Sequence, residues 1–120
     1  MAFVKTVLVV DDHAGFRVEA RRFLESIGYT VVADAVDGAS AVGAARSFRP
    51  DIILLDVVLP DIDGFTVARQ LAAEGSPARV ILISTREAQD YGGKVASCGA
   101  VGFIAKSDLS ARTFTALAGA

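Results

Sequence analysis

The stretch DIILLDVVLPDIDG at residues 51–64 carries the clearest information about the fold. Its four consecutive apolar residues, 52–55, have the length of a strand and lack the polar alternation of a strand with one face in water. A parallel strand that helices cover on both faces has this composition. Asp56 follows directly, so we expect a carboxylate at the carboxyl end of a buried strand.

Other apolar runs occur along the chain, separated by segments in which apolar residues recur with helical spacing. This alternation predicts βαβ units and an α/β fold with a doubly wound, five-stranded parallel sheet. The runs are VLVV at 7–10, VILI at 80–83, VGFIA at 101–105 and, more weakly, VVADA at 31–35.

Glycine, proline and capping residues predict where the helices begin and end. The expected helices are 16–27 before Gly28, 41–48 before Pro50, 68–72 before Gly75 and Pro77, 87–97, and 109–117 with Ser107 or Asp108 as its N-cap. Within 87–97, the pair Gly92-Gly93 costs about 2 kcal/mol relative to alanine. We therefore expect that helix to be short or mobile.

Length and composition restrict the class of protein. A chain of 120 residues fits one domain, expected to span 1–120. The net charge of −2, from 12 basic and 14 acidic side chains, argues against a nucleic-acid surface. Cys98 is the only cysteine, which excludes an internal disulfide and indicates a reducing compartment. The apolar runs are too short to span a bilayer and no signal-peptide pattern is present, so we expect a cytoplasmic protein without membrane contact.

Polar residues follow four of the apolar runs at the point where each predicted strand ends. They are Asp11 and Asp12, Asp56, Ser84 and Thr85, and Lys106. In an open α/β sheet, ligands bind beyond the carboxyl ends of the strands, at the point where the strand order reverses. We therefore expect three carboxylates, a hydroxyl and an ammonium group to meet at one edge of the sheet.

Carboxylates this close repel one another and need a cation to keep them ionised. Mg²⁺ suits oxygen ligands, keeps several waters and accepts phosphate oxygens, with Mn²⁺ as an alternative. Lys106 would bind one phosphate oxygen, and Ser84 would donate a hydrogen bond to another. The carboxylate that remains accessible could attack phosphorus and form an acyl phosphate.

Each group also has a plain structural explanation. Asp12, Asp63 and Asp108 all suit the N-cap of a helix, and capping is the preferred explanation for the last two. Capping accounts for one of the adjacent Asp11 and Asp12, but not for both. Lys106 alone would be a solvated lysine, so the joint placement of these groups is what favours a phosphate and metal site.

Four motifs together resemble the receiver domains of two-component response regulators, which have a CheY-like, flavodoxin-like fold with strand order 2-1-3-4-5. The motifs are VLVVDD (7–12), LLDVVLPDIDG (54–64), LIST (82–85) and GFIAK (102–106), and the resemblance covers essentially the whole chain. The runs DDHxxxR (11–17) and KSDL (106–109) look most like receivers of LuxR-type regulators. In those proteins a DNA-binding domain follows, and the sequence leaves open whether one was removed here or never existed.

The resemblance implies that Asp56 is the phosphoacceptor. It also implies that Mg²⁺ is held by Asp11, Asp12, Asp56 and the backbone carbonyl of Val58. The family often has proline after the lysine, whereas this chain has Ser107. His13 is expected to be structural because Mg²⁺ prefers oxygen ligands.

Further roles follow from the same resemblance. Ser84 would be the switch hydroxyl that moves toward a bound phosphoryl group, and Lys106 would bind that group. Phe103 would be a switch aromatic, with simple core packing as an equal alternative. Val58 and Arg86 would tune the rate at which the acyl phosphate hydrolyses, although a solvated side chain explains Arg86 equally well.

The resemblance implies a signalling phosphoacceptor rather than an enzyme. A sensor histidine kinase or a phosphotransfer protein would supply the phosphoryl group. The added charge would then alter the surface around the fourth helix, fifth strand and fifth helix. That change would control an output domain for transcription regulation or a partner protein, with homodimer formation on phosphorylation as a further option. The domain itself would make no direct contact with nucleic acid.

Three other functions remain as alternatives. A phosphatase of the haloacid-dehalogenase type would place a second acid two positions after its nucleophile, where this chain has His13. A flavodoxin-like module for FMN would need a phosphate-binding loop where Asp11 and Asp12 would repel the ligand. A pseudo-receiver that only mediates contacts would have no need of the complete set of polar groups.

Overall fold

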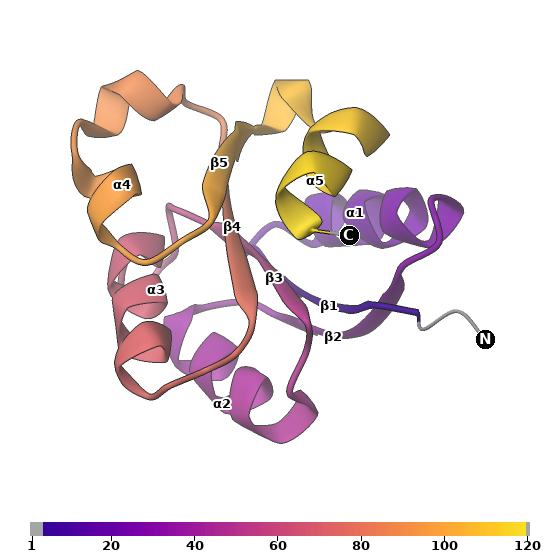
Figure 1. Cartoon of the computed structure of the whole chain (residues 1–120), viewed down its shortest axis with the longest axis horizontal. Helices are drawn as coiled ribbons and strands as arrows, with labels where there is room; N and C mark the ends of the chain where they lie inside the picture. The colour runs from indigo at the N-terminus through magenta and orange to yellow at the C-terminus, as the bar shows by residue number, and fades with distance from the viewer. Residues whose placement is uncertain (1–3, 120) are drawn as a thin grey trace.

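The computed structural model describes residues 4–119 (Figure 1). Within this range, five strands form one parallel sheet in the predicted order β2-β1-β3-β4-β5. The strands are β1 (Thr6–Val10), β2 (Thr30–Ala35), β3 (Ile52–Asp56), β4 (Arg79–Ser84) and β5 (Gly102–Ala105). The strand order reverses between β1 and β3, which puts the expected binding edge at the carboxyl ends of these two strands.

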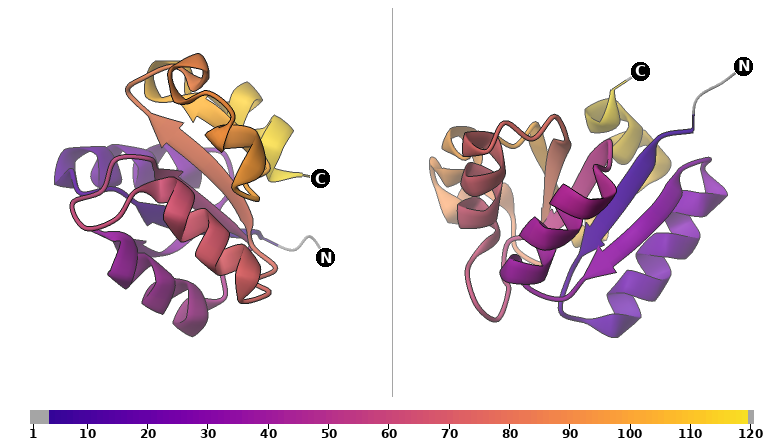
Figure 2. Two further views of the ribbon diagram at one scale, coloured as in Figure 1. Left: turned by 90° about the vertical axis from the view of Figure 1, so that its left-hand side faces the viewer. Right: turned by 90° about the horizontal axis from the view of Figure 1, so that it is seen from below.

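Helices cover both faces of the sheet (Figure 2). The helices α1 (Ala14–Ser26) and α5 (Ala111–Ala118) lie on one face, and α2 (Gly38–Phe48), α3 (Gly64–Ala73) and α4 (Lys94–Ser97) lie on the other. In β3, Ile53 and Leu55 pack toward α2 and α3, whereas Ile52 and Leu54 pack toward α1 and α5. The unbroken apolar run is therefore explained by burial on both faces. Within residues 4–119, every helix is too short or too polar to cross a bilayer.

The structure confirms three predicted helix ends. Helix α1 ends at Ser26 shortly before Gly28, and α3 ends at Ala73 shortly before Gly75. These glycines have φ values of 99° and 74°, which glycine adopts without strain. Helix α2 ends at Phe48, before Pro50.

The predicted start of the last helix is wrong. Helix α5 begins at Ala111, with Ser110 rather than Ser107 or Asp108 as its N-cap. The Ser110 side chain accepts a hydrogen bond from the Thr113 N–H at 3.1 Å, and the Thr113 hydroxyl accepts one from the Ser110 N–H at 2.9 Å. This reciprocal cap satisfies two backbone donors at once, which explains why the helix starts there. The preceding residues form the 3₁₀ helix η2 (Lys106–Asp108), and its peptide bonds are trans.

Little of the segment between β4 and β5 forms regular secondary structure, in keeping with the short helix expected there. It contains a 3₁₀ helix, η1 (Ala88–Tyr91), and the single turn of α4. Between them Gly92 has φ 61° and ψ −138°, a conformation open essentially only to glycine. Gly93 has φ −76° and ψ −3°, which any residue can adopt.

Alanine substitutions at these two glycines test this description, because a Cβ atom would meet open space at both positions. We expect Gly93→Ala to stabilise the protein by about 0.5 kcal/mol, because alanine fits the native backbone conformation and lowers the conformational entropy of the unfolded chain. Gly92→Ala should destabilise it by about 1–2 kcal/mol, since it forces a strained backbone. Urea unfolding of both variants measures the difference, and equal effects would contradict the assigned backbone conformations.

Candidate functional site at the carboxyl edge of the sheet

The carboxyl ends of β1, β3 and β5 bring two acids and a lysine into contact. The Lys106 ammonium group lies 2.6 Å from Asp11 Oδ2 and 3.3 Å from Asp56 Oδ2. The side chain of Asp11 is fully buried, and that of Asp56 is 5% exposed. The lysine also lies over the ring of Phe16, with Nζ 4.3 Å from the ring centre. One cation therefore bridges two buried carboxylates that lie 45 residues apart in the chain.

Burial and charge act differently on the two acids. Burial, together with the neighbouring Asp11 carboxylate, raises the pKa of Asp56 from its ordinary 3.8 to about 6. Burial also acts to raise the pKa of Asp11, but hydrogen bonds from Lys106 and from the His13 N–H outweigh it and leave that pKa lowered. For Lys106, burial is outweighed by its bond to Asp11 and the charge of Asp56, so its pKa is raised. The single positive charge of Lys106 is thus shared by two carboxylates, and it offsets the negative charge of Asp56 less than that of Asp11.

Asp12 and His13 complete a group of four residues that could hold a metal ion. Asp11, Asp12, His13 and Asp56 each offer a ligand atom, and these atoms lie within 4.8 Å of one another. Asp12 is partly exposed and does not cap α1, whose N-cap is His13 without a side-chain bond. His13 Nδ1 lies 3.1 Å from both Asp11 Oδ1 and Asp12 Oδ1. The structure therefore brings His13 into the acidic cluster, whereas the sequence predicts only a structural role for it.

Asp11 is further positioned by a residue that sequence reasoning used only as part of a motif. Arg17 donates a hydrogen bond from its guanidinium group to the Asp11 backbone carbonyl at 2.7 Å. Its Nε also lies 3.5 Å from Asp34 Oδ2. The arginine in the DDHxxxR run therefore joins α1 to the ends of β1 and β2.

The loop between β3 and α3 holds Val58 beside Asp56. The Val58 N–H donates to Asp56 Oδ1 at 3.2 Å, and its side chain is 61% exposed. At the end of the loop, the Gly64 N–H donates to the Val57 carbonyl at 2.7 Å. A Cβ atom at Gly64 would lie 2.4 Å from the Asp56 carbonyl oxygen, so only glycine allows the loop to close this tightly.

Two aspartates in the same loop have different structural roles. Asp63 caps α3 by accepting a hydrogen bond from the Thr66 N–H at 2.8 Å, as predicted. Asp61 instead reaches another helix, where its two carboxylate oxygens accept the N–H groups of Gly38 at 2.7 Å and Ala39 at 3.0 Å. The loop is thus fixed to the N-terminus of α2, a contact across 23 residues that no local pattern predicts.

Ser84 lies at the end of β4 and is fully buried. It pairs with Ala105, the residue before Lys106, so it shares the edge of the sheet with the lysine. Its hydroxyl accepts a hydrogen bond from the Arg86 N–H at 3.1 Å and shares a 2.6 Å hydrogen bond with the hydroxyl of Tyr91. Sequence reasoning did not consider Tyr91.

The Tyr91 ring lies between two aromatic side chains of the core. It packs edge-on against Phe65 at 5.3 Å and lies tilted against Phe103 at 6.0 Å, measured between ring centres. Phe103 is half-buried and packs against the core, so its geometry fits both core packing and a movable ring. Arg86 is exposed, and its backbone rather than its side chain contacts Ser84.

Comparison with known families decides between the classes of protein that use this fold. The family model of the response regulator receiver domain matches residues 7–117. The chain belongs to this family. Receivers are phosphoacceptor signalling domains with an acidic pocket for Mg²⁺, in keeping with the group of Asp11, Asp12 and Asp56.

The receiver is similar to proteins of more than one architecture. It is 35% identical to the Escherichia coli response regulator UvrY over 101 residues, which are 83% of this chain and 46% of UvrY. It is 32% identical to the Bacillus subtilis chemotaxis protein CheY over 111 residues, 92% of each chain. A crystal structure of a LuxR-family two-component response regulator from Aurantimonas superposes with a TM-score of 0.82 at 31% identity, covering 88% of this chain and 76% of that one. The receiver spans about half the length of several transcription regulators that it matches.

The pKa of Asp56 predicts how removing its charge affects stability. Because the folded-state pKa is about 6 and the ordinary value 3.8, the folded receiver binds this proton more tightly than the unfolded chain does. Ionisation of Asp56 therefore opposes folding, with no effect below about pH 4 and its full effect above about pH 6. We expect metal-free Asp56→Asn to be more stable than the parent by on the order of 2 kcal/mol at about pH 7.5. The difference should disappear as the pH falls to about 4.

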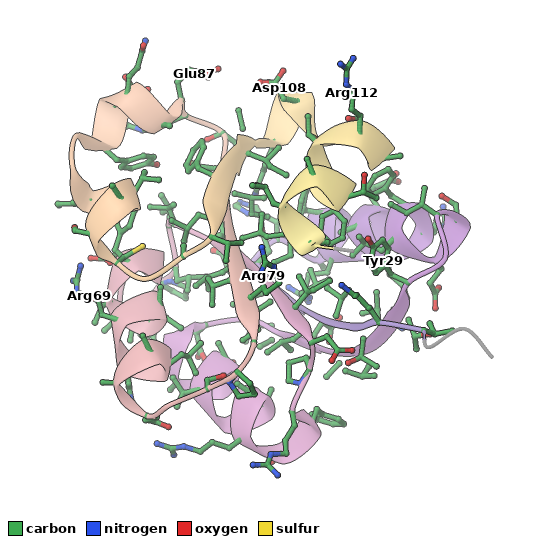
Figure 3. All side chains as sticks on the ribbon, in the orientation of Figure 1. Tyr29, Arg69, Arg79, Glu87, Asp108 and Arg112 are labelled. Carbon is green, nitrogen blue, oxygen red and sulfur yellow. The ribbon has the colours of Figure 1, made fainter. Side chains whose placement is uncertain are left out.

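Urea unfolding at several pH values measures this effect. Asp108→Asn is the matched control, since Asp108 points outward from η2 and lies outside the acidic cluster (Figure 3). Two results would contradict the raised pKa of Asp56. One is a stabilisation by Asp56→Asn that does not change with pH, and the other is a parent that is more stable than Asp56→Asn near neutral pH.

Proposed function

We propose that this receiver accepts a phosphoryl group on Asp56 from the phosphohistidine of a sensor kinase or a phosphotransfer protein. The observation that carries the proposal is the Lys106 ammonium group between two buried carboxylates. A lysine in this place neutralises part of the acidic charge and is available to a phosphate oxygen once a group is added to Asp56.

Asp56 is a better nucleophile candidate than Asp11 because of the contacts that each acid already makes. Both oxygens of Asp11 are engaged, one by His13 and the other by Lys106 at 2.6 Å. Asp56 has longer bonds, 3.2 Å to the Val58 N–H and 3.3 Å to Lys106. In the transfer, an Asp56 oxygen forms a bond to phosphorus while the P–N bond to the donor histidine breaks and its electron pair returns to the imidazole nitrogen.

The acidic cluster fits a hard divalent cation. Buried carboxylates with one neighbouring lysine leave negative charge uncompensated, and oxygen donors suit Mg²⁺ or Mn²⁺. We assign its ligands as Asp11, Asp12, Asp56 and the Val58 backbone carbonyl. When bound, the ion would neutralise charge on the phosphoryl oxygens during transfer. His13 adjoins this set, but its nitrogen is a poorer ligand for Mg²⁺.

Phosphorylation would act on the surface through Ser84. A phosphoryl group adds about two negative charges and accepts hydrogen bonds, and a neighbouring hydroxyl is suited to donate one. The Phe103 ring would then turn inward, into the space beside β5 that the Ser84 hydroxyl leaves when it moves. The exposed side chains of Val58 and Arg86 flank the edge of the sheet, where they would control the access of water to the acyl phosphate.

The output of the proposed signal depends on a partner. The surface of α4, β5 and α5 would control an output domain, with transcription regulation favoured by the similarity to several transcription regulators. A separate partner protein, as the similarity to CheY suggests, and a phosphorylation-dependent homodimer are the alternatives. The net charge of −2 favours action through such partners and not through direct contact with nucleic acid. The single cysteine suits the cytoplasm as the setting.

Phosphorylation by a small-molecule donor tests this proposal directly. The parent protein, incubated with acetyl phosphate and Mg²⁺, should gain the mass of one phosphoryl group, as measured by intact-mass spectrometry. Asp56→Asn should gain none, and omission of Mg²⁺ should abolish the gain in the parent. Folded parent protein that stays unmodified under these conditions would contradict the proposal and favour a pseudo-receiver.

The loop contacts predict that Asp61 and Asp63 differ in their effect on the proposed metal ligand at Val58. Asp61→Ala removes both hydrogen bonds that hold the loop to α2, so we expect it to weaken Mg²⁺ binding on the order of tenfold. Asp63→Ala removes the same charge from the same loop but only a helix cap, so it should cost about 1 kcal/mol of stability and change Mg²⁺ affinity less than about twofold. Calorimetric Mg²⁺ titration of both variants gives the comparison, and equal affinities would contradict this role of Asp61.

A further inference from the structure

We propose that the Tyr91 hydroxyl is a positioning group for Ser84 that competes with a phosphoryl group on Asp56. The proposal rests on the function proposed above and names the residue through which the switch hydroxyl would act. In the resting receiver, Tyr91 holds Ser84 toward η1. When Ser84 turns to donate to a phosphoryl oxygen, Tyr91 loses its partner and η1 is released.

The bonds of the Ser84 hydroxyl carry the first step. A serine hydroxyl has one proton to donate and two lone pairs to accept with. In the described part of the chain, the Ser84 oxygen is bonded to the Arg86 N–H at 3.1 Å and to the Tyr91 hydroxyl at 2.6 Å. Both partners lie on the β4–η1 side of the residue, so the hydroxyl is oriented by this segment and not by Lys106 or the acids. Either hydroxyl can be the donor in the 2.6 Å bond. Rotation of the Ser84 side chain toward Asp56 would carry its oxygen away from the tyrosine and so break that bond.

The surroundings of Tyr91 show why its release would spread. Its ring is half-buried between Phe65 of α3 and Phe103 of β5. A partly buried hydroxyl that loses its partner is less favourable than one bonded to water, so the ring would move toward water after Ser84 leaves. That movement opens space beside Phe103. It thereby couples a one-atom change at the edge of the sheet to the faces of α3 and β5.

The segment that carries Tyr91 is weakly held. The 3₁₀ helix η1 has four residues, none of them buried, and Gly92-Gly93 follows it directly. Few buried contacts and exposed backbone bonds characterise segments that open at low cost in free energy. The short bond from Tyr91 to Ser84 therefore ties a loose segment to the rigid end of β4.

The test compares two conservative substitutions, Tyr91→Phe and Tyr29→Phe, which cover both tyrosines of the chain. Each removes one hydroxyl and leaves the ring. Tyr29 lies near α1 and α5 (Figure 3), where its ring packs edge-on against Phe114 at 5.0 Å. The probe is beryllofluoride with Mg²⁺, a mimic of the aspartyl phosphate, and its affinity is measured by ¹⁹F NMR titration.

If Tyr91 competes for Ser84, Tyr91→Phe should bind beryllofluoride about three- to tenfold more tightly than the parent, and Tyr29→Phe should stay within about twofold. In a Ser84→Ala background, Tyr91→Phe should have no effect on the affinity. Unchanged or weaker binding by Tyr91→Phe overturns the proposal. A parent that binds no beryllofluoride contradicts the proposed function itself, and the inference falls with it.

A second readout follows the ring directly. The chain has no tryptophan, so in Tyr29→Phe the only tyrosine emission comes from Tyr91. Saturation with Mg²⁺ and beryllofluoride should change that emission, because the hydroxyl loses its bond to Ser84. In Tyr91→Phe, where only Tyr29 emits, the emission should stay constant. Bound probe without a change in Tyr91 emission overturns the proposal.

Discussion

The ammonium group of Lys106 between the buried carboxylates of Asp11 and Asp56 is the interaction on which the rest of the site depends. Each of these residues follows the end of a different strand or forms it, so the parallel sheet is what brings them together. One positive charge cannot fully compensate two buried acids, and the excess falls on Asp56. This imbalance favours the binding of a further cation, as proposed for Mg²⁺, and leaves one carboxylate less tightly held than its neighbour.

Two kinds of connection lead away from this centre. The loop after β3 is held closely, by Asp61 at the N-terminus of α2 and by the backbone contact at Gly64. The segment after β4 is held loosely, through the bond between Ser84 and Tyr91. A site that keeps a metal ligand in place and also transmits a change would need one rigid and one loose connection. The rigid connection lies beside the proposed metal ligand Val58, and the loose one lies on the side of the proposed signalling surface.

Much of the fold could be predicted from the sequence because parallel strands with two buried faces give unbroken apolar runs, as at residues 52–55 of β3. The strand ends then indicated which polar residues share an edge. The helix start at Ala111 was missed because Ser107 and Asp108 are also plausible caps, and only the reciprocal bonds between Ser110 and Thr113 distinguish the true one. The contacts of Tyr91 and Asp61 depend on tertiary structure. No pattern singles out Tyr91, and the motif at 54–64 contains Asp61 without indicating its contact with α2. The roles assigned to the site residues stay predictions.

A ¹³C NMR titration of the aspartate carboxyl groups, with and without Mg²⁺, would measure the charge imbalance at Asp56 itself. With the Asp56 signal assigned through Asp56→Asn, we expect this carboxyl to titrate near pH 6 in the metal-free protein and at lower pH once Mg²⁺ is bound. An Asp56 carboxyl that titrates at its ordinary value of 3.8 and does not respond to Mg²⁺ would contradict this imbalance.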